Sequence, residues 1–303
     1  MNNLIDGRAI AADIHRETSV RVAALRQRGI QPGLAFLRVG EDPASQVYVG
    51  MKEKKALELG IVSHTTVLPE ATTQAELLAR IDRLNADPAC HGILVQAPLP
   101  AHIDSAAIYA AVYPGKDVDG FHPVNVGRLL LGDGGGFLPC TPAGVHELLV
   151  RTGVRLPGAE VVVLGRGNIV GKPMASILIQ KSPSANCTVT LCHSATRDIA
   201  SHCRRADVII AAMGVPEFLK ADMVRDGAVV IDVGVNRIPD ASSKSGTRLV
   251  GDVAFAEVQP KCRWITPNPG GVGPMTIAML LANTVTAAEW QSQKKSKNPL
   301  TLP

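Results

Sequence analysis

The chain has 303 residues and a mass of 31.9 kDa, a length that fits two domains of ordinary size better than one small module. Hydrophobic residues make up 46% of it and charged residues 19%, which excludes an intrinsically disordered protein. Aromatic residues make up only 3% and the net charge is +4, so we expect neither a carbohydrate cleft nor a nucleic-acid-binding surface.

Cysteine usage and hydropathy indicate the compartment. The six cysteines include no C-x-x-C pair, so we expect free thiols and no disulfide scaffold. The cysteines and histidines of residues 187–203 have spacings that fit no zinc module, and no metal site is expected. The first residues lack a basic patch followed by an apolar run, and no stretch reaches the ~20 apolar residues that span a bilayer. We therefore expect a cytoplasmic protein without a membrane segment.

Helical and extended patterns alternate in the first part of the chain. Helices are predicted at residues 7–25, 44–60 and 72–85. Strands are predicted at residues 34–39, 62–68 and 92–96. This β-α-β-α order is typical of a parallel sheet covered by helices.

Glycine and proline crowd residues 114–142, which indicates a domain boundary. A helix predicted at residues 142–152 leads into a second alternation. Its strands are predicted at residues 161–164, 188–192, 207–212, 228–233 and 264–266, and its helices at residues 172–181 and 198–205.

The final helix is predicted at residues 275–290, after another break of proline and glycine, so we expect it to pack back on the first domain. The predicted domains are therefore residues 1–140 plus 275–303, and residues 141–274. The predicted fold class is α/β, with a parallel sheet in each domain.

A glycine-rich turn follows the predicted strand at residues 161–164. Gly165, Gly167 and Gly171 are spaced as G-x-G-x-x-x-G, and a helix begins at the third glycine. Such a turn offers free backbone N–H groups and a helix N-terminus to a phosphate. The spacing is one residue longer than the common dinucleotide-binding fingerprint, and a β-α turn without a ligand can have a similar sequence. With strands on both sides, we favour nucleotide binding.

The end of the next strand indicates which nucleotide. NAD-preferring sites place Asp or Glu there to hold the ribose 2′-hydroxyl, whereas residues 191–194 here are Leu-Cys-His-Ser. Arg166 lies in the turn and Arg197 follows the strand, and a guanidinium with a hydroxyl suits a 2′-phosphate. We therefore predict NADP; the alternative is that Arg166 only points into solvent.

Tyr48 and Lys52 lie four residues apart on the predicted helix at residues 44–60, so their side chains share a face. A lysine beside a tyrosine and an apolar sheet can have its pKa lowered enough to move protons near neutrality. The alternative is a lysine whose stem packs while its ammonium reaches water. Short-chain dehydrogenases also use Tyr-x-x-x-Lys, but their glycine-rich turn precedes that helix, whereas Gly165 follows it far downstream.

Three loop segments add candidate residues. Gln96 ends a buried strand, where side chains emerge at the carboxyl edge of a parallel sheet. Residues 116–121, KDVDGF, offer carboxylates in a loop. Residues 269–274, PGGVGP, form a stiff turn with few side chains before the last helix. Each segment alone can also be interpreted as an ordinary turn.

Residues 39–52, VGEDPASQVYVxxK, resemble the N-terminal signature of the bifunctional methylenetetrahydrofolate dehydrogenase/methenyltetrahydrofolate cyclohydrolase family. Further segments resemble the family's other signatures, in the family's order, at residues 92–100, 116–121, 165–173, 232–234 and 269–276. The resemblance covers nearly the whole chain.

The resemblance implies a fold and a substrate site. The fold would be an N-terminal α/β domain completed by the C-terminal helix, with an NADP-binding Rossmann domain between and the folate in the cleft. Lys52 would be the catalytic lysine, assisted by Tyr48 and Gln96. The Asp119 carboxylate would accept two hydrogen bonds from the pterin ring. The residues that the resemblance assigns to the substrate are Tyr48, Asp119, Pro269, Gly270 and Gly271.

The resemblance also implies a cofactor site and an assembly. The residues that it assigns to NADP are Gly165, Arg166, Gly167, Ile169, Val170, Gly171, Ser194 and Val235. Among these, Arg166 and Ser194 would hold the 2′-phosphate. The family also implies a homodimer.

The implied chemistry has two steps. Hydride passes from the methylene carbon of 5,10-methylenetetrahydrofolate to NADP, and water then adds to the 5,10-methenyl product, which opens to 10-formyltetrahydrofolate. Hydride transfer depends mainly on proximity and orientation, whereas hydrolysis needs a proton acceptor. Lys52 should therefore matter more for hydrolysis.

Three residues depart from the family's pattern. Gly167 stands where the family usually has Ser, which removes a hydroxyl near the cofactor phosphates and bears on NADP affinity and preference. Ala254 replaces a commonly polar residue and Asn268 a usual Val, and these two are expected to tune the substrate pocket.

Two other functions are open. A different NADP-dependent dehydrogenase, acting on a small hydroxy or keto acid, would need an anion-binding arginine in the first domain, where the Asp119 loop offers the opposite charge. A dinucleotide sensor or scaffold without chemistry predicts decayed catalytic positions, whereas Lys52, Gln96 and Asp119 are all present.

Overall fold

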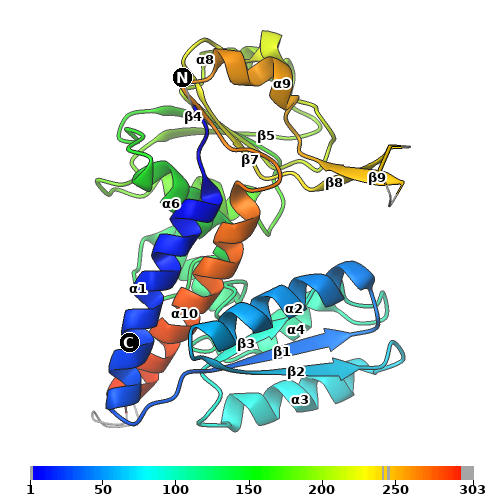
Figure 1. The fold of residues 1–303 in the computed structure, drawn as a ribbon, viewed down its shortest axis with the longest axis vertical. Helices are drawn as coiled ribbons and strands as arrows, with labels where there is room; N and C mark the ends of the chain where they lie inside the picture. The colour runs from blue at the N-terminus through cyan, green and yellow to red at the C-terminus, as the bar shows by residue number, and fades with distance from the viewer. Residues whose placement is uncertain (1–2, 241, 244–245, 295–303) are drawn as a thin grey trace. The chain divides into compact units, whose positions relative to one another are not determined.

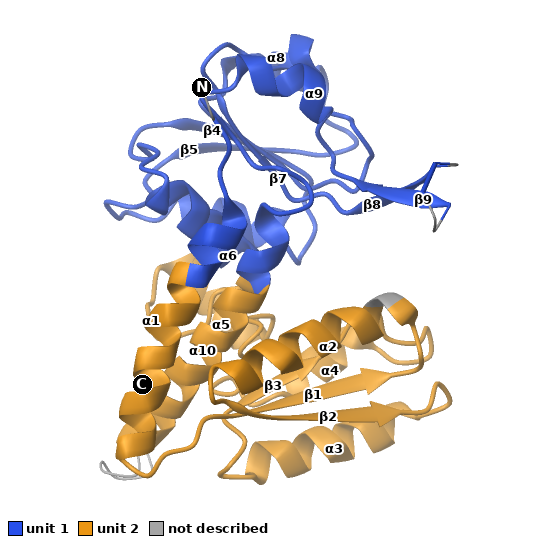
Figure 2. Ribbon diagram, in the orientation of Figure 1, with its two compact units in different colours: residues 1–12, 141–276 blue, residues 13–140, 277–303 orange. Residues whose placement is uncertain are grey.

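The computed structural model of the chain describes residues 3–240, 242–243 and 246–294. It divides into two compact units (Figure 2): unit 1 is Met1–Ala12 with Thr141–Thr276, and unit 2 is Asp13–Cys140 with Ile277–Pro303. Residues 1–12, which we predicted to belong to the first domain, join the other unit because the Ile5 amide donates to the carbonyl of Ile265 (2.8 Å). Within the described residues, no helix is long and apolar enough to cross a membrane.

Unit 2 is built on a parallel sheet. Its strands are β1 (Gly33–Val39), β2 (Val62–Leu68) and β3 (Gly92–Val95). Its helices are α2 (Pro43–Glu58), α3 (Gln74–Ala86), α4 (Ser105–Ala111) and α5 (Pro123–Leu131), with most of α1 (Gly7–Gln27) and of α10 (Val272–Lys294). The strand order is β2-β1-β3, so β1 lies in the centre.

Helices cover both faces of this sheet, and every residue of β1 is therefore buried. Leu34 and Phe36 pack with residues of α2, whereas Ala35 and Leu37 pack with residues of α3, on the opposite face (Figure 1). Alternate side chains of a strand point to opposite faces, so a central strand covered on both sides is apolar throughout. The elements predicted between residues 7 and 96 are confirmed, with small shifts at their ends.

The prediction that the last helix packs back on the first domain is also confirmed. Leu280, Leu281 and Val285 of α10 share a core with Val22 of α1 and Phe36 of β1. This contact completes the hydrophobic core of unit 2 with a segment distant in sequence.

The sequence did not predict α4 or α5. In α5, Pro123 occupies the first turn, where its missing N–H is not needed, and the His122 ring accepts from the Val124 amide (3.0 Å). Gly132 ends the helix with a φ of 74°. Proline and glycine therefore bound a helix here, in a stretch that we interpreted as a domain boundary. The helix predicted at residues 142–152 is α6 (Cys140–Arg151).

Unit 1 contains a second parallel sheet. Its strands are β4 (Glu160–Leu164), β5 (Thr188–Cys192), β6 (Val208–Ala211), β7 (Val229–Asp232) and β10 (Trp264–Ile265). Its other elements are α7 (Gly171–Leu178), α8 (Ile199–Arg205), α9 (Phe255–Val258), the 3-10 turns η1 (Ala221–Met223) and η2 (Gln259–Lys261), and an unpredicted antiparallel hairpin of β8 (Asn236–Pro239) and β9 (Thr247–Val250).

The strand order β10-β7-β6-β4-β5 confirms the predicted Rossmann-type fold. β4 pairs with β5 on one side and with β6 on the other, so the winding of the chain reverses at this point. Open α/β sheets bind ligands outside the carboxyl ends of the strands at such a reversal.

Candidate active site and cofactor-binding turn

In unit 2 the structure brings together Lys52, Tyr48 and Gln96. Lys52 Nζ donates a hydrogen bond to Gln96 Oε1 (3.1 Å) and lies 4.5 Å from the centre of the Tyr48 ring. The amide of Gln96 donates in turn to the Ala97 carbonyl (2.6 Å), which orients its oxygen toward the lysine. Lys52 is only 4% exposed, so the alternative of an ammonium in bulk water does not describe it.

Burial shifts the proton equilibria of Lys52 and Asp119 in opposite directions. Desolvation lowers the pKa of Lys52 from its ordinary value of 10.5, and the Asp119 carboxylate opposes this shift. Desolvation raises the pKa of Asp119, and Lys52 opposes that shift. Lys52 therefore loses its proton at a lower pH than an exposed lysine does.

The loop that carries Asp119 uses its other charged residues for structure. Lys116 Nζ donates to two backbone carbonyls at the end of α3, at 2.9 and 2.7 Å. Asp117, whose pKa is raised by burial to about 7, accepts from the Asn125 amide and from the backbone N–H of His122, each at 2.8 Å. Of the two carboxylates in this loop, Asp119 is the one that interacts with Lys52, and it also accepts from the Cys140 thiol, a distinction that the sequence KDVDGF did not reveal.

The turn predicted to line the folate lies in unit 1. Gly270 has a φ of +113°, and a Cβ added to Gly271 would lie 2.7 Å from the Pro267 carbonyl oxygen. A Cβ on Gly7 would lie 1.8 Å from the Gly271 oxygen. Tight backbone packing alone therefore explains these glycines, whether or not a ligand binds. The contact of Pro269, Gly270 and Gly271 with a folate stays a prediction.

In the turn after β4, close backbone approach requires the first and third glycines. Gly165 has a φ of +107°, and an added Cβ would lie 2.2 Å from the Ala212 oxygen. A Cβ on Gly171 would lie 2.0 Å from the Gly165 oxygen. Gly167 has nothing within 4 Å of an added Cβ. The second glycine of the pattern is therefore not needed for the backbone, and the position has room for a serine.

The same turn leaves the N-terminus of α7 available. Val170 is the N-cap residue and supplies no side-chain hydrogen bond. The Lys172 N–H donates to the Gly167 carbonyl (3.1 Å) and Pro173 has no N–H, so the Gly171 N–H and the positive end of the helix dipole remain for a phosphate. Arg166 and Ser194 are exposed after β4 and β5, on the carboxyl edge of the sheet. Their contact with a 2′-phosphate stays a prediction.

Apolar side chains are exposed along this edge of the sheet. Ile169 follows β4 and is 55% exposed, and Val235 follows β7 and is 74% exposed. Val215, which follows β6, is 45% exposed and was missed by the sequence reasoning. The feature that could have indicated Val215 is its position after β6, the strand beside the point where the winding of the chain reverses. Three exposed apolar side chains at the ends of three strands suit the flat rings of a dinucleotide.

The structure locates the other two departures from the family's pattern in unit 1. Ala254 is the N-cap of α9 and provides no side-chain hydrogen bond. The Asn268 amide donates to the Gly234 carbonyl, beside the loop that carries Val235. Their effect on a substrate pocket stays a prediction.

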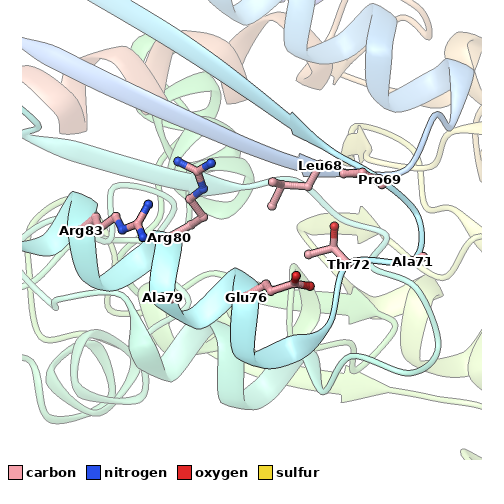
Figure 3. Close-up of a pocket in the computed structure, with 8 residues that line it drawn as sticks. All are labelled: Leu68, Pro69, Ala71, Thr72, Glu76, Ala79, Arg80 and Arg83. Atoms are coloured by element: carbon pink, nitrogen blue, oxygen red, sulfur yellow. The ribbon is translucent and has the colours of Figure 1, made fainter.

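A surface groove of about 440 Å³ lies elsewhere on unit 2 (Figure 3). It is lined by Leu68, Pro69, Ala71, Thr72, Glu76, Ala79, Arg80 and Arg83. The carboxylate of Glu76 accepts from the Thr73 amide (2.8 Å) in a helix capping box, so it is already used in the fold. None of the predicted site residues lines this groove. Within the described residues, no group of His, Cys, Asp or Glu is arranged to hold a metal ion.

Comparison with known proteins gives matches over most of the chain. The family model "Tetrahydrofolate dehydrogenase/cyclohydrolase, catalytic domain" matches residues 5–119, and "Tetrahydrofolate dehydrogenase/cyclohydrolase, NAD(P)-binding domain" matches residues 139–292. The "Bifunctional protein FolD" of Chlorobium phaeobacteroides is 55% identical over 93% of this chain and 95% of its own length.

Solved structures match to a similar extent. The bifunctional FolD dehydrogenase/cyclohydrolase of Campylobacter jejuni is 50% identical, with a TM-score of 0.89, over 94% of this chain and 98% of its own. The Trypanosoma brucei FolD, solved with NADP cofactor and inhibitor, is 42% identical, with a TM-score of 0.89, over 97% of this chain and 98% of its own.

Proposed function

The chain belongs to the tetrahydrofolate dehydrogenase/cyclohydrolase family, and on this basis we propose which of its residues carry out the two activities. The enzyme oxidises 5,10-methylenetetrahydrofolate with NADP to 5,10-methenyltetrahydrofolate, and it hydrolyses this product to 10-formyltetrahydrofolate. Unit 2 is the proposed catalytic, folate-binding domain and unit 1 the proposed NADP-binding domain.

Lys52 is the proposed catalytic residue of the hydrolytic step. The observation that carries this assignment is the buried Nζ atom, held by Gln96 over the Tyr48 ring, with burial lowering the pKa of the amine. A neutral amine can accept the proton of the water that attacks the methenyl carbon. When the bond from that carbon to the folate ring nitrogen breaks, the ammonium can return the proton to the nitrogen, and the hydroxyl proton leaves to solvent as the formyl carbonyl forms. Gln96 keeps the amine in position through both transfers.

Asp119 is proposed to hold the pterin ring. A carboxylate accepts two parallel hydrogen bonds from an amidine-like edge, and such donors favour its charged form. Burial raises the pKa of Asp119, so a ligand that donates to it would offset the cost of keeping the carboxylate charged. The neighbouring Asp117 is already satisfied by the fold, which supports Asp119 as the recognition group.

The turn after β4 fits NADP because it lies at the carboxyl edge of the sheet, where the winding reverses between β5 and β6, and leads into the N-terminus of α7. Bound there, NADP accepts the hydride from the methylene carbon. We propose that Arg166 and Ser194 bind the 2′-phosphate, since residues 193–197, directly after β5, include no carboxylate to hold a 2′-hydroxyl. The remaining proposed contacts of the cofactor are Gly165, Gly167, Ile169, Val170, Gly171 and Val235.

A homodimer formed through β2 is also proposed. Among the described residues β2 pairs with β1 alone, and it exposes Val62 (55%) and Val67 (47%). An unpaired edge with apolar side chains can pair with a second copy. Val67→Lys should then give a monomer in light-scattering chromatography; a wild-type monomer at the same concentration contradicts this proposal.

The enzyme is expected in the cytoplasm, with no nucleic-acid partner.

The activity is tested by mixing the protein with methylenetetrahydrofolate and either NADP or NAD. Reduced nicotinamide and the methenyl absorbance are followed separately. We expect reduction with NADP at a higher kcat/KM than with NAD, and decay of added methenyltetrahydrofolate even without nucleotide. Absence of both signals would rule out the proposed function, and equal kcat/KM for the two nucleotides would remove the role of Arg166 and Ser194.

A further inference from the structure

Asp252 is a fully buried carboxylate in unit 1, between β9 and α9. Its Oδ2 atom accepts from the backbone N–H of Met213 (2.7 Å) and of Gly214 (2.9 Å). Its Oδ1 atom accepts from the side-chain amide of Asn236 (2.8 Å). One carboxylate therefore ties together the loop after β6 and the loop after β7.

A second buried carboxylate holds Asp252 in place. Asp232, at the end of β7, accepts from the backbone N–H of Asp252 (2.9 Å) and of Gly234 (3.0 Å). Glycine backbone packs closely against both carboxylates: a Cβ on Gly234 would lie 2.2 Å from Asp252 Oδ1, and a Cβ on Gly251 would lie 1.7 Å from Asp232 Oδ2. The Asp252 side chain is therefore fixed by contacts from several segments.

The two loops that Asp252 joins carry exposed apolar side chains. Val215 follows Gly214 directly, and Val235 precedes Asn236. Both are exposed at the carboxyl edge of the sheet, at 45% and 74%. An exposed valine gains nothing from the fold by itself, so a buried charge that fixes the backbone beside it indicates that the position of these loops matters for a ligand.

The position of these loops along the sheet indicates which half of the cofactor they meet. In a Rossmann sheet the pyrophosphate lies at the glycine turn and the adenosine ribose at the end of the next strand, here β5. The other half of the dinucleotide therefore extends past β4 toward β6 and β7, where Val215 and Val235 lie.

We propose that Asp252 is a positioning residue for the dehydrogenase step, which fixes the loops after β6 and β7 as the seat of the nicotinamide half of NADP. The proposal rests on the proposed function of unit 1 as the NADP-binding domain. Asp252 touches neither reacting atom; it acts through the backbone of Met213 and Gly214 and through Asn236.

The test compares Asp252→Ala with Asp252→Asn. The alanine leaves two backbone N–H groups and the Asn236 amide without their acceptor, and we expect kcat/KM of the dehydrogenase for NADP to fall by ~10- to 100-fold. In Asp252→Asn the side-chain oxygen still accepts from the two N–H groups. The Asn236 amide can turn so that its oxygen accepts from the new side-chain NH2 group. Most of the dehydrogenase activity should therefore return. Glu257→Ala, which removes an exposed carboxylate of α9, is the matched control.

Two further measurements separate positioning from a general loss of structure. Cyclohydrolase activity, assayed on methenyltetrahydrofolate without nucleotide, should stay at the wild-type level in all variants. Binding of 2′,5′-ADP, which contains only the adenosine half, should also be unchanged. Equal loss of both enzyme activities, or loss of 2′,5′-ADP binding along with NADP, would overturn the proposal.

If Asp252→Ala is insoluble, Asn236→Ala carries the same test, because it removes a single bond to the carboxylate. We expect a several-fold fall in dehydrogenase kcat/KM with normal cyclohydrolase activity; unchanged dehydrogenase activity would overturn the proposal. A wild-type protein without NADP-dependent activity would instead refute the proposed function, so the two failures are distinguishable.

Discussion

The proposed proton-transfer site of unit 2 and the proposed cofactor turn of unit 1 differ in where they keep their charges. In unit 2 the working cation is buried, since Lys52 is 4% exposed and desolvation lowers its pKa. In unit 1 the proposed ligand contacts Arg166, Ser194 and Val235 are exposed, while the buried carboxylates Asp232 and Asp252 hold loops.

The difference follows from the two tasks. A group that moves protons near neutrality needs a shifted pKa, and burial supplies the shift. A turn that binds a polyanion from water needs accessible donors and space rather than a shifted pKa. Burial of Lys52 therefore serves its proposed chemistry, whereas burial of Asp232 and Asp252 serves the support of loops.

Removal of the buried amine should have the largest effect. Lys52→Met should lower cyclohydrolase kcat by at least ~100-fold, because it removes the proposed proton acceptor, while NADP binding stays unchanged. Lys54→Met, an exposed lysine of the same helix, is the control. Hydrolysis at the wild-type rate in Lys52→Met would remove Lys52 from the mechanism.

The glycine turn should show the next largest effect, and it tests the claim that the backbone shape of this turn in unit 1 matters for cofactor binding. Gly165→Ala places a Cβ against the Ala212 backbone at a φ of +107°, and NADP affinity should fall by at least ~10-fold. Gly167→Ala has open space and should bind NADP within about twofold of wild type. Titration of NADPH fluorescence measures both, and equal affinities would contradict the comparison.

Buried Asp117 sharpens the comparison inside unit 2, because it is buried for structure and not for chemistry. Burial raises its pKa from 3.8 to about 7, so the folded protein keeps a proton that the unfolded chain releases. The free energy of unfolding should therefore fall as pH rises from about 4 to about 7, by at most ~1.4 kcal/mol per pH unit from this group.

Asp117→Asn should remove that part of the slope, measured by urea unfolding at several pH values. The exposed carboxylate of Asp82 serves as control, and Asp82→Asn should leave the slope as in wild type. If Asp117→Asn keeps the full slope, the carboxylate is already charged in the folded protein at neutral pH.

The smallest effect concerns α7 and α9 of unit 1, which begin without a capping side chain. At α7 the free N-terminus has a proposed ligand, whereas at α9 Ala254 leaves it open without one. Because Ala254 is only 8% exposed, a small uncharged cap suits this position. Ala254→Ser should cap α9 and raise the free energy of unfolding by about 0.5–1 kcal/mol, with NADP affinity unchanged. Ala254→Val, which cannot cap, should bring no gain, and a gain of equal size in both variants would exclude capping as the cause.

Local patterns predicted much of the fold and part of the site. The alternation of strands and helices gave both sheets, and the four-residue spacing placed Tyr48 and Lys52 on one face of α2. The proline and glycine residues around α5 were interpreted as a domain boundary, and the helix was missed. These residue types interrupt a helix when they lie in its interior, but they are also common at its first and last positions. The units also differ from the predicted domains at residues 1–12, where pairing with a distant strand decides.

Side-chain periodicity and the backbone freedom of glycine are local properties, so the sequence by itself determined the two parallel sheets, the glycine turn and the shared face of Tyr48 and Lys52. Desolvation and hydrogen-bond pairing depend on segments far apart in the chain. Only the tertiary structure decided that Lys52 is buried, that Asp117 serves the fold while Asp119 remains for the site, and that Asp252 joins the loops of Gly214 and Asn236. Water and partner groups around a charge set its pKa, and these are fixed only when the chain has folded.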